Sequence, residues 1–195
     1  MDARLSASGL TRGQRLAARS ILAVLALGVV LLLVTDGDRR PLGPEVLAGI
    51  DELRVQLADD PAPSFDLAGT EGIRHRLGDF AGRPLLVHFW ASWCPTCLPE
   101  LPLFQQLQAR YGPRGLQQLH VSLDEEPAAA VRVLPRGFQL PVAFDPGGSL
   151  AHRFGTEKLP EVYLLDAHGR VRLRFVANQP WLSPPMLRLL DGFMP

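Results

Sequence analysis

The stretch Leu85-Leu-Val-His-Phe-Trp-Ala-Ser-Trp-Cys-Pro-Thr-Cys97 places two cysteines shortly after a run that is apolar except for one histidine. A short apolar run of this kind is typical of a strand buried on both faces of a sheet. Cys94 and Cys97 are the only cysteines in the chain. Because a loop closed by such close neighbours constrains the unfolded chain very little, the pair is better suited to redox chemistry than to stabilising the fold.

Residues 94–111 are predicted to form a helix that begins at Cys94. A helix N-terminus offers unpaired N–H groups and the positive end of the helix dipole, and both favour the thiolate of Cys94. Cys97, one turn later, would lie beneath Cys94 and could resolve a mixed disulfide within the same molecule. Pro95 fixes the backbone of the first turn, and Thr96 can offer its hydroxyl or N–H group to a sulfur atom.

Strands and helices alternate on either side of this stretch. The pattern predicts strands at 64–67, 72–77, 85–90, 116–123, 141–144, 162–165 and 171–176, with helices at 44–59, 94–111, 126–137, 149–154 and 184–193. This order predicts an α/β fold whose sheet has mixed strand direction and is covered by helices.

The N-terminal region has the pattern of a membrane anchor. Residues 20–35 contain no charge, and the residues just before them extend the apolar run to about the 20 that a spanning helix needs. Four arginines and one acid precede the run, so the positive-inside rule places the N-terminus in the cytoplasm. We predict a cytoplasmic segment at 1–19, an anchor at 20–35, a linker with a helix at 36–60 and a folded domain at 61–195.

Two other interpretations of the apolar run are weaker. A cleaved signal peptide would finish in two small residues separated by one other residue, and Val-Thr-Asp-Gly fits that pattern poorly. A core helix would be apolar on one face, whereas this run is apolar all round.

Composition argues against several kinds of partner. The net charge is about zero, so nothing indicates nucleic acid. The five histidines show no paired spacing, and two cysteines supply only half of a zinc site. Covalent haem would need histidine directly after Cys97, where Leu98 stands. We therefore expect neither a metal nor a cofactor.

Leu86-Val-His-Phe-Trp-Ala-Ser-Trp-Cys-Pro-Thr-Cys-Leu-Pro-Glu100 closely resembles the active site of TlpA/ResA/DsbE-like membrane-anchored thioredoxins. The resemblance covers roughly residues 61–195 and includes Ala62–Leu67, Leu77–Gly82 and Phe154–Asp166. It implies a thioredoxin fold with additional N-terminal strands and a central insertion between about Asp124 and Leu150. It also implies thiol–disulfide oxidoreductase activity.

The same resemblance assigns several site residues. It implies that Pro160 is a cis-proline facing the cysteines and that the backbone of Leu159 is free to pair with a substrate peptide. It adds Trp93 as a substrate contact. It implies that Glu100 exchanges a proton with Cys97, although an acid in the first turn can equally stabilise a helix.

Two positions depart from the family pattern. His88 stands where thioredoxins proper have a buried carboxylate that assists the second cysteine, and a neutral imidazole could do that work. Alternatively, it is a half-buried strand residue paired with a backbone group. Lys158 replaces a glycine, and its ammonium group either lowers the pKa of Cys94 or lies in solvent.

The resemblance implies reduction of disulfides in extracytoplasmic proteins, with apocytochrome c as one substrate and a membrane thiol transporter as electron donor. It implies a single-pass protein of a bacterial inner membrane with a periplasmic catalytic domain. A disulfide oxidase or isomerase is one alternative. A non-catalytic assembly factor that holds thiol peptides is another.

Overall fold

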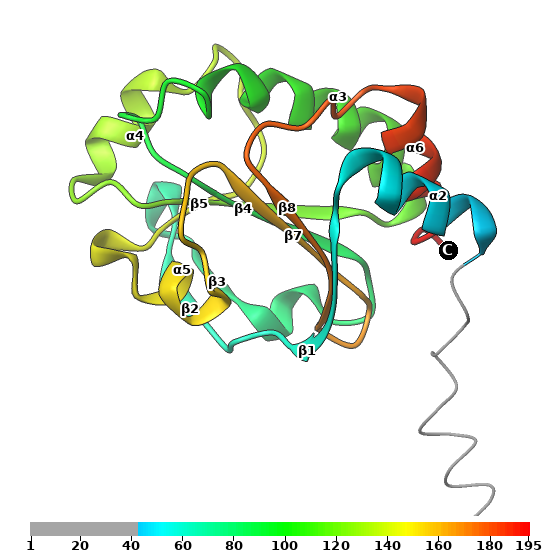
Figure 1. Cartoon of the computed structure of the whole chain (residues 1–195). Coiled ribbons are helices and arrows are strands. Elements are labelled where there is room, and N and C mark those ends of the chain that lie inside the picture. Colours follow the sequence, from blue (N-terminus) through cyan, green and yellow to red (C-terminus); the bar gives the residue numbers. More distant parts are fainter. Residues whose placement is uncertain (1–42) are drawn as a thin grey trace, which may run out of the picture. The chain divides into compact units, whose positions relative to one another are not determined.

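The computed structural model describes residues 43–195 (Figure 1). The predicted cytoplasmic segment and anchor at 1–35 lie outside these residues, as does most of the predicted linker. Within the described part of the chain, no helix is long and apolar enough to cross a membrane.

A six-stranded mixed sheet forms the centre of the fold, in the order β1-β8-β7-β4-β5-β6. Its strands are β1 Gln56–Pro61, β4 Leu85–Trp90, β5 Gln117–Ser122, β6 Val142–Phe144, β7 Glu161–Leu165 and β8 Arg170–Val176. Strands β4, β5 and β6 run parallel, whereas β7, β8 and β1 are joined by antiparallel pairing. The predicted mixed direction is therefore confirmed. A separate two-stranded sheet pairs β2 Asp66–Ala68 with β3 Arg74–Arg76.

Helices cover both faces of the central sheet. They are α2 Pro44–Leu53, α3 Leu101–Tyr111, α4 Pro127–Val133, α5 Ser149–Phe154 and α6 Pro184–Asp191. Figure 1 shows α3 and α6 on one side of the sheet, with α5, β2 and β3 on the other. Helix α2 packs beside α6.

Strand β4 is buried along its whole length because both of its faces are covered. Leu85, Val87 and Phe89 belong to the apolar cluster on the side of α5. Leu86 belongs to the cluster beneath α3 and α6, and the His88 ring lies 4.6 Å from that of Phe104 on α3. The side-chain alternation of a strand therefore directs His88 toward the helix that follows the cysteines.

The predicted helix at 44–59 is wrong in its second half. Helix α2 ends at Leu53, since Arg54 adopts a left-handed conformation with φ 53° and its N–H bonds back to Asp51. Residues 56–61 then form β1, which pairs with β8. This edge strand is largely exposed and polar, so its sequence lacks the apolar alternation that identifies a strand.

The predicted helix start at Cys94 is also wrong. Helix α3 begins at Leu101, and the preceding residues form tight turns, in which the N–H groups of Cys94, Cys97 and Glu100 each bond to the carbonyl three residues earlier. Pro95, Pro99 and Pro102 lack the N–H groups that a regular helix through this segment would need. The full dipole of α3 therefore does not begin at Cys94.

The expected central insertion is the segment that joins β5 to α5, and it contains α4 and the edge strand β6. Helix α4 ends at Val133, two residues before Pro135, whose missing N–H cannot continue a helix, so the helix predicted at 126–137 is shorter than expected. The strands predicted at 162–165 and 171–176 correspond to β7 and β8, which form a hairpin that turns at Asp166–Gly169.

Candidate active site

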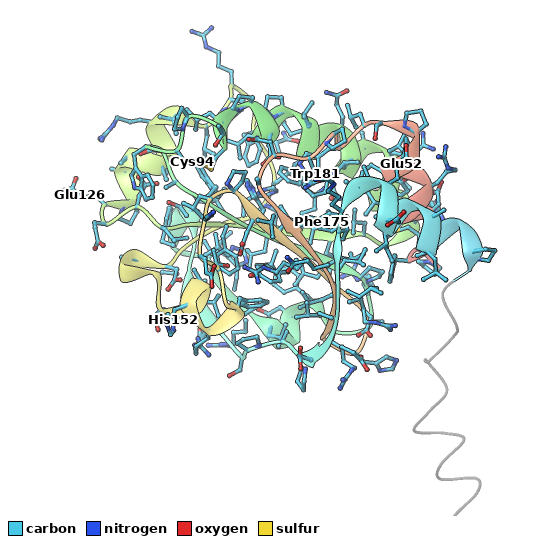
Figure 2. The ribbon with its side chains drawn as sticks, viewed as in Figure 1. Glu52, Cys94, Glu126, His152, Phe175 and Trp181 are labelled. Carbon is cyan, nitrogen blue, oxygen red and sulfur yellow. A yellow bond between two sulfur atoms is a disulfide. The ribbon has the colours of Figure 1, made fainter. Side chains whose placement is uncertain are left out.

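Cys94 and Cys97 lie in the turns that follow the carboxyl end of β4, and Figure 2 labels Cys94. They are joined by a disulfide, with 5.4 Å between their Cα atoms. Cys97 is fully buried, whereas Cys94 keeps 4% of its surface exposed and lines a surface groove. An incoming partner can therefore reach Cys94 but not Cys97.

A buried carboxylate fixes the segment before the cysteines. Asp124, at the end of β5, accepts hydrogen bonds from the N–H of Ser92 at 2.9 Å and from its hydroxyl at 2.5 Å. The hydroxyl of Ser122 donates to the same side chain at 2.6 Å. These hydrogen bonds connect the residues just before Cys94 to the segment that follows β5.

The turn between the cysteines is held from the C-terminal part of the chain. The hydroxyl of Thr96 lies 3.5 Å from the Cys94 sulfur, as its type and position suggested. The side chain of Asn178 donates to the Thr96 carbonyl at 2.6 Å. Sequence reasoning missed Asn178, because nothing in the local pattern places the loop before α6 beside the cysteines.

The peptide bond between Leu159 and Pro160 is cis, as expected. A groove of about 420 Å³ runs past it and past Cys94. The groove is lined by Trp93, Cys94, Pro95, Thr96, Leu123, Thr156, Glu157, Lys158 and Leu159. Among residues 43–195, nothing pairs with the backbone N–H or carbonyl of Leu159, so both are available to an extended peptide.

Both residues that the sequence singled out at the rim of the groove are exposed. The side chain of Trp93 is 66% exposed, which is unusual for a tryptophan and suits a contact with a partner. Lys158 is exposed and lines the groove, so its ammonium group is solvated while it remains on the same wall as Leu159.

An ion pair between buried Glu161 and half-buried Arg174 supports the segment that carries the cis-proline. Glu161 directly follows Pro160 and accepts from Arg174 at 2.7 Å and from the Tyr163 hydroxyl at 2.8 Å. Arg174 also donates to the carbonyl of Gly155, at the other end of the same loop. Burial, followed by the contact with Glu161, raises the pKa of Tyr163, so its hydroxyl remains a donor.

Glu100 is buried beneath the cysteine turns and is only 2% exposed. Its Oε1 accepts from the indole Nε1 of Trp181 at 2.8 Å and from the N–H of Gln179 at 3.2 Å. Burial raises its pKa to about 7, although these donors favour the charged form. The side chain makes no capping hydrogen bond to α3, and its oxygen accepts from the C-terminal loop instead.

His88 is fully buried, and its Nδ1 lies 3.0 Å from Nδ1 of His120 on the neighbouring strand. Its Nε2 lies 3.8 Å from Oε2 of Glu100. The interpretation of His88 as half-buried and paired with a backbone group is therefore wrong. Burial, with a smaller effect of His120, holds the pKa of His88 well below its usual value.

Sequence reasoning did not assign a role to His120. The signal was present, because His88 and His120 occupy the same register in two adjacent parallel strands. The described residues contain no cluster of three or more metal-ligating side chains arranged to hold an ion.

Comparison with known proteins agrees with this geometry. Residues 57–187 match the Redoxin family. The chain is 28% identical to the thiol-disulfide oxidoreductase ResA of Bacillus thuringiensis (strain Al Hakam) over 154 residues, which are 77% of this chain and 87% of ResA.

Solved structures point in the same direction. A crystal structure from Chlorobium tepidum, described as a thiol:disulfide interchange protein of the DsbE type, is 33% identical with a TM-score of 0.64. It covers 71% of this chain and 99% of its own. A Bacteroides vulgatus structure described as a thiol-disulfide oxidoreductase is 26% identical with a TM-score of 0.61, over 71% of this chain and 98% of its own. The chain thus belongs to the Redoxin family and, within it, to the TlpA/ResA/DsbE-like thiol–disulfide oxidoreductases.

Proposed function

We propose that the chain is a membrane-anchored, extracytoplasmic reductase of protein disulfides. The observation that carries the proposal is the groove shared by Cys94 and Leu159, which brings a reactive sulfur beside backbone groups free to hold a peptide. The arrangement suits extended polypeptides that present a disulfide at the same place.

In the first step, the thiolate of Cys94 attacks one sulfur of the substrate disulfide. A bond forms between Cys94 and that sulfur, and the other substrate sulfur leaves as a thiolate that takes a proton from solvent. Cys94 acts first because it lines the groove while Cys97 is fully buried.

In the second step, Cys97 loses its proton and attacks the sulfur of Cys94. The bond between Cys94 and the substrate breaks, the substrate leaves as a second thiol, and the Cys94–Cys97 disulfide forms. The substrate thereby gains two electrons and two protons. Glu100, whose pKa of about 7 lets it accept a proton near neutral pH, serves as the base for Cys97.

The resemblance to ResA-type proteins supports reduction as the direction. It also supports apocytochrome c as one substrate and a membrane thiol transporter that returns the pair to its reduced form. The uncharged run at 20–35 and the arginines before it support a single-pass anchor in a bacterial inner membrane, with the catalytic domain in the periplasm.

A trapping experiment tests the reaction. The full chain, solubilised in detergent, is prepared as Cys97→Ser and as Cys94→Ser and mixed with a disulfide-containing protein. Cys97→Ser should accumulate a mixed disulfide through Cys94, and Cys94→Ser should accumulate none. Equal non-covalent binding by both variants, without trapping, would instead identify a holding factor.

The reduction potential of the pair tests the direction. We expect a value close to about −270 mV, which is that of an electron donor such as thioredoxin. A value close to about −120 mV would show an oxidant of thiols and would remove the reductase proposal.

A further inference from the structure

Glu100, His88 and His120 form a buried chain of polar groups beneath the cysteines. Oε2 of Glu100 faces Nε2 of His88 at 3.8 Å, and Nδ1 of His88 faces Nδ1 of His120 at 3.0 Å. Phe104 covers both rings from α3, with centroids 4.6 Å and 5.1 Å from its own. The three polar side chains are therefore enclosed in apolar surroundings, where hydrogen bonds and ionic contacts are stronger than in water.

The two oxygens of Glu100 are not equivalent. Oε1 faces two donors, the indole of Trp181 and the N–H of Gln179, and therefore cannot carry the proton itself. Within residues 43–195, Oε2 of Glu100 and Nε2 of His88 have no other hydrogen-bond partner. A proton taken up by Glu100 therefore resides on Oε2, and a shift of about 1 Å brings it within bonding distance of His88.

The contact between the two histidines restricts their tautomers. Burial lowers the pKa of both rings, that of His120 to about 3, so both are neutral near pH 7. In a neutral pair, one Nδ1 must donate and the other must accept. Which of the two rings donates in this hydrogen bond determines whether Nε2 of His88 presents a proton or a lone pair to Glu100.

Each direction of the histidine–histidine hydrogen bond suits one protonation state of the Glu100 carboxyl group. When His120 donates, His88 carries its proton on Nε2 and can donate to the Glu100 carboxylate. When His88 donates, its Nε2 has a lone pair that can accept from protonated Oε2. On ionisation, the proton of Glu100 Oε2 passes to Nε2 of His88 and the Nδ1 proton of His88 passes to Nδ1 of His120. The Nε2 proton of His120 leaves to solvent, so the carboxylate faces His88 Nε2–H and one proton is lost in total.

We propose that His88, backed by His120, is a positioning residue for Glu100, and that the two rings exchange tautomers as Glu100 gains or loses its proton. The groups facing Glu100 support this assignment. His88 on β4 is the titratable group opposite Oε2, Cys97 lies in the same turn, and the loop before α6 contributes only neutral groups, at Asn178, Gln179 and Trp181. The kinetic consequence rests on the proposed role of Glu100 as the base for Cys97.

The tautomers can be observed without any reaction, so this test is independent of the proposed function. The oxidised full chain, labelled with ¹⁵N at histidine and kept in detergent, is titrated between pH 5 and pH 9. We expect the rings of His88 and His120 to change tautomer in opposite senses. The change should follow the titration of Glu100, with its midpoint near pH 7, and neither ring should become charged. In Glu100→Gln the change should disappear. Fixed tautomers in the wild type, or protonation of either ring to imidazolium, would overturn the proposal.

Two variants of His88 give a matched kinetic test. An asparagine amide reaches the place of Nδ1 and a glutamine amide the place of Nε2, so His88→Gln keeps a partner for Glu100 and His88→Asn does not. A hydrogen bond to a charged carboxylate is stronger than one to its neutral form. His88→Asn should therefore move the pH midpoint of the Cys97 step upward by about one unit and slow that step roughly fivefold at pH 7. His88→Gln should restore most of the rate, and equal effects of the two variants would contradict the proposal.

Discussion

The indole of Trp181 donates a 2.8 Å hydrogen bond to Glu100, across 81 residues of sequence. Both side chains are buried, and the indole packs against Phe104 and Phe175, with ring centroids 4.9 Å and 5.1 Å away. Figure 2 labels Trp181 and Phe175. The carboxyl group under the cysteines is thus held by a ring that belongs to the main apolar core. Its orientation depends on the packing of the C-terminal segment.

Replacement of Trp181 by phenylalanine should raise the pKa of Glu100 above its value of about 7. The change removes a donor that stabilises the carboxylate, while burial, which favours the neutral form, remains. A hydrogen bond to a charged group is worth about 1.5–3 kcal/mol, so we expect a rise of roughly one to two units. The carboxyl ¹³C shift of Glu100, followed against pH in the oxidised chain, measures this change.

Trp90→Phe is the matched control. Trp90 is also fully buried, but within the described residues its indole N–H has no partner. This variant should leave the pKa of Glu100 unchanged. If both variants move it equally, the effect comes from altered packing and not from the lost hydrogen bond.

The stability of the oxidised chain should depend on pH through Glu100. Its folded-state pKa of about 7 lies above the ordinary value of 4.5, so the folded chain binds this proton more tightly than the unfolded chain. The stabilisation is complete below pH 4.5, is lost as pH rises from 4.5 through 7, and amounts to about 3 kcal/mol. Urea unfolding of the wild type and of Glu100→Gln, at intervals from pH 4 to pH 8, measures the difference.

The comparison with Glu100→Gln is needed because His88 and His120 act in the opposite sense. Their folded-state pKa values are lowered, so their contribution to stability is present above about pH 6.5 and is lost as pH falls. The wild type and Glu100→Gln both lose this histidine contribution at low pH, so it cancels in the difference between their unfolding free energies. If the difference in unfolding free energy stays constant over the whole range, the pKa of Glu100 is not raised by folding.

The sequence best predicts those structural features that are determined by a few consecutive residues. The run Leu85–Trp90 was predicted with its observed bounds, because a strand buried on both faces is apolar nearly throughout. The cis-proline at Pro160 came from resemblance, since no local pattern distinguishes it from an ordinary turn. The start of α3 was misplaced because the apolar spacing continues through the prolines that prevent a regular helix.

The surroundings of Glu100 could not be predicted in the same way. Trp181 and Gln179 reach it from a loop near the C-terminus, and their position depends on how α6 packs against the sheet. His88 and His120 could have been paired from sequence, but only with the register of β4 and β5 already known. Long-range packing decides this part of the site.

Replacement of Trp93 by alanine should weaken substrate binding without affecting the fold. The ring is 66% exposed on the rim of the groove, so its removal should change the free energy of unfolding by less than about 0.5 kcal/mol. The KM for a protein disulfide should rise severalfold, while the kcat changes little. Leu57→Ala is the control, because Leu57 is 54% exposed on β1 and does not line the groove. A rise in KM for both variants would show a general surface effect.

Replacement of Arg174 by methionine should destabilise the chain by about 3 kcal/mol or more. The change leaves the carboxylate of Glu161 buried with only the Tyr163 hydroxyl as a donor, and an unpaired buried charge is costly. Arg170→Met on the same strand is the control, since its pair with Asp59 is 39% and 56% exposed and should be worth less than about 1 kcal/mol. Combining Arg174→Met with Glu161→Gln should recover much of the loss, because the unpaired charge is then removed. Chemical denaturation of the four proteins measures these differences, and equal effects of the two arginine variants would show that the Glu161 ion pair does not support the cis-proline segment.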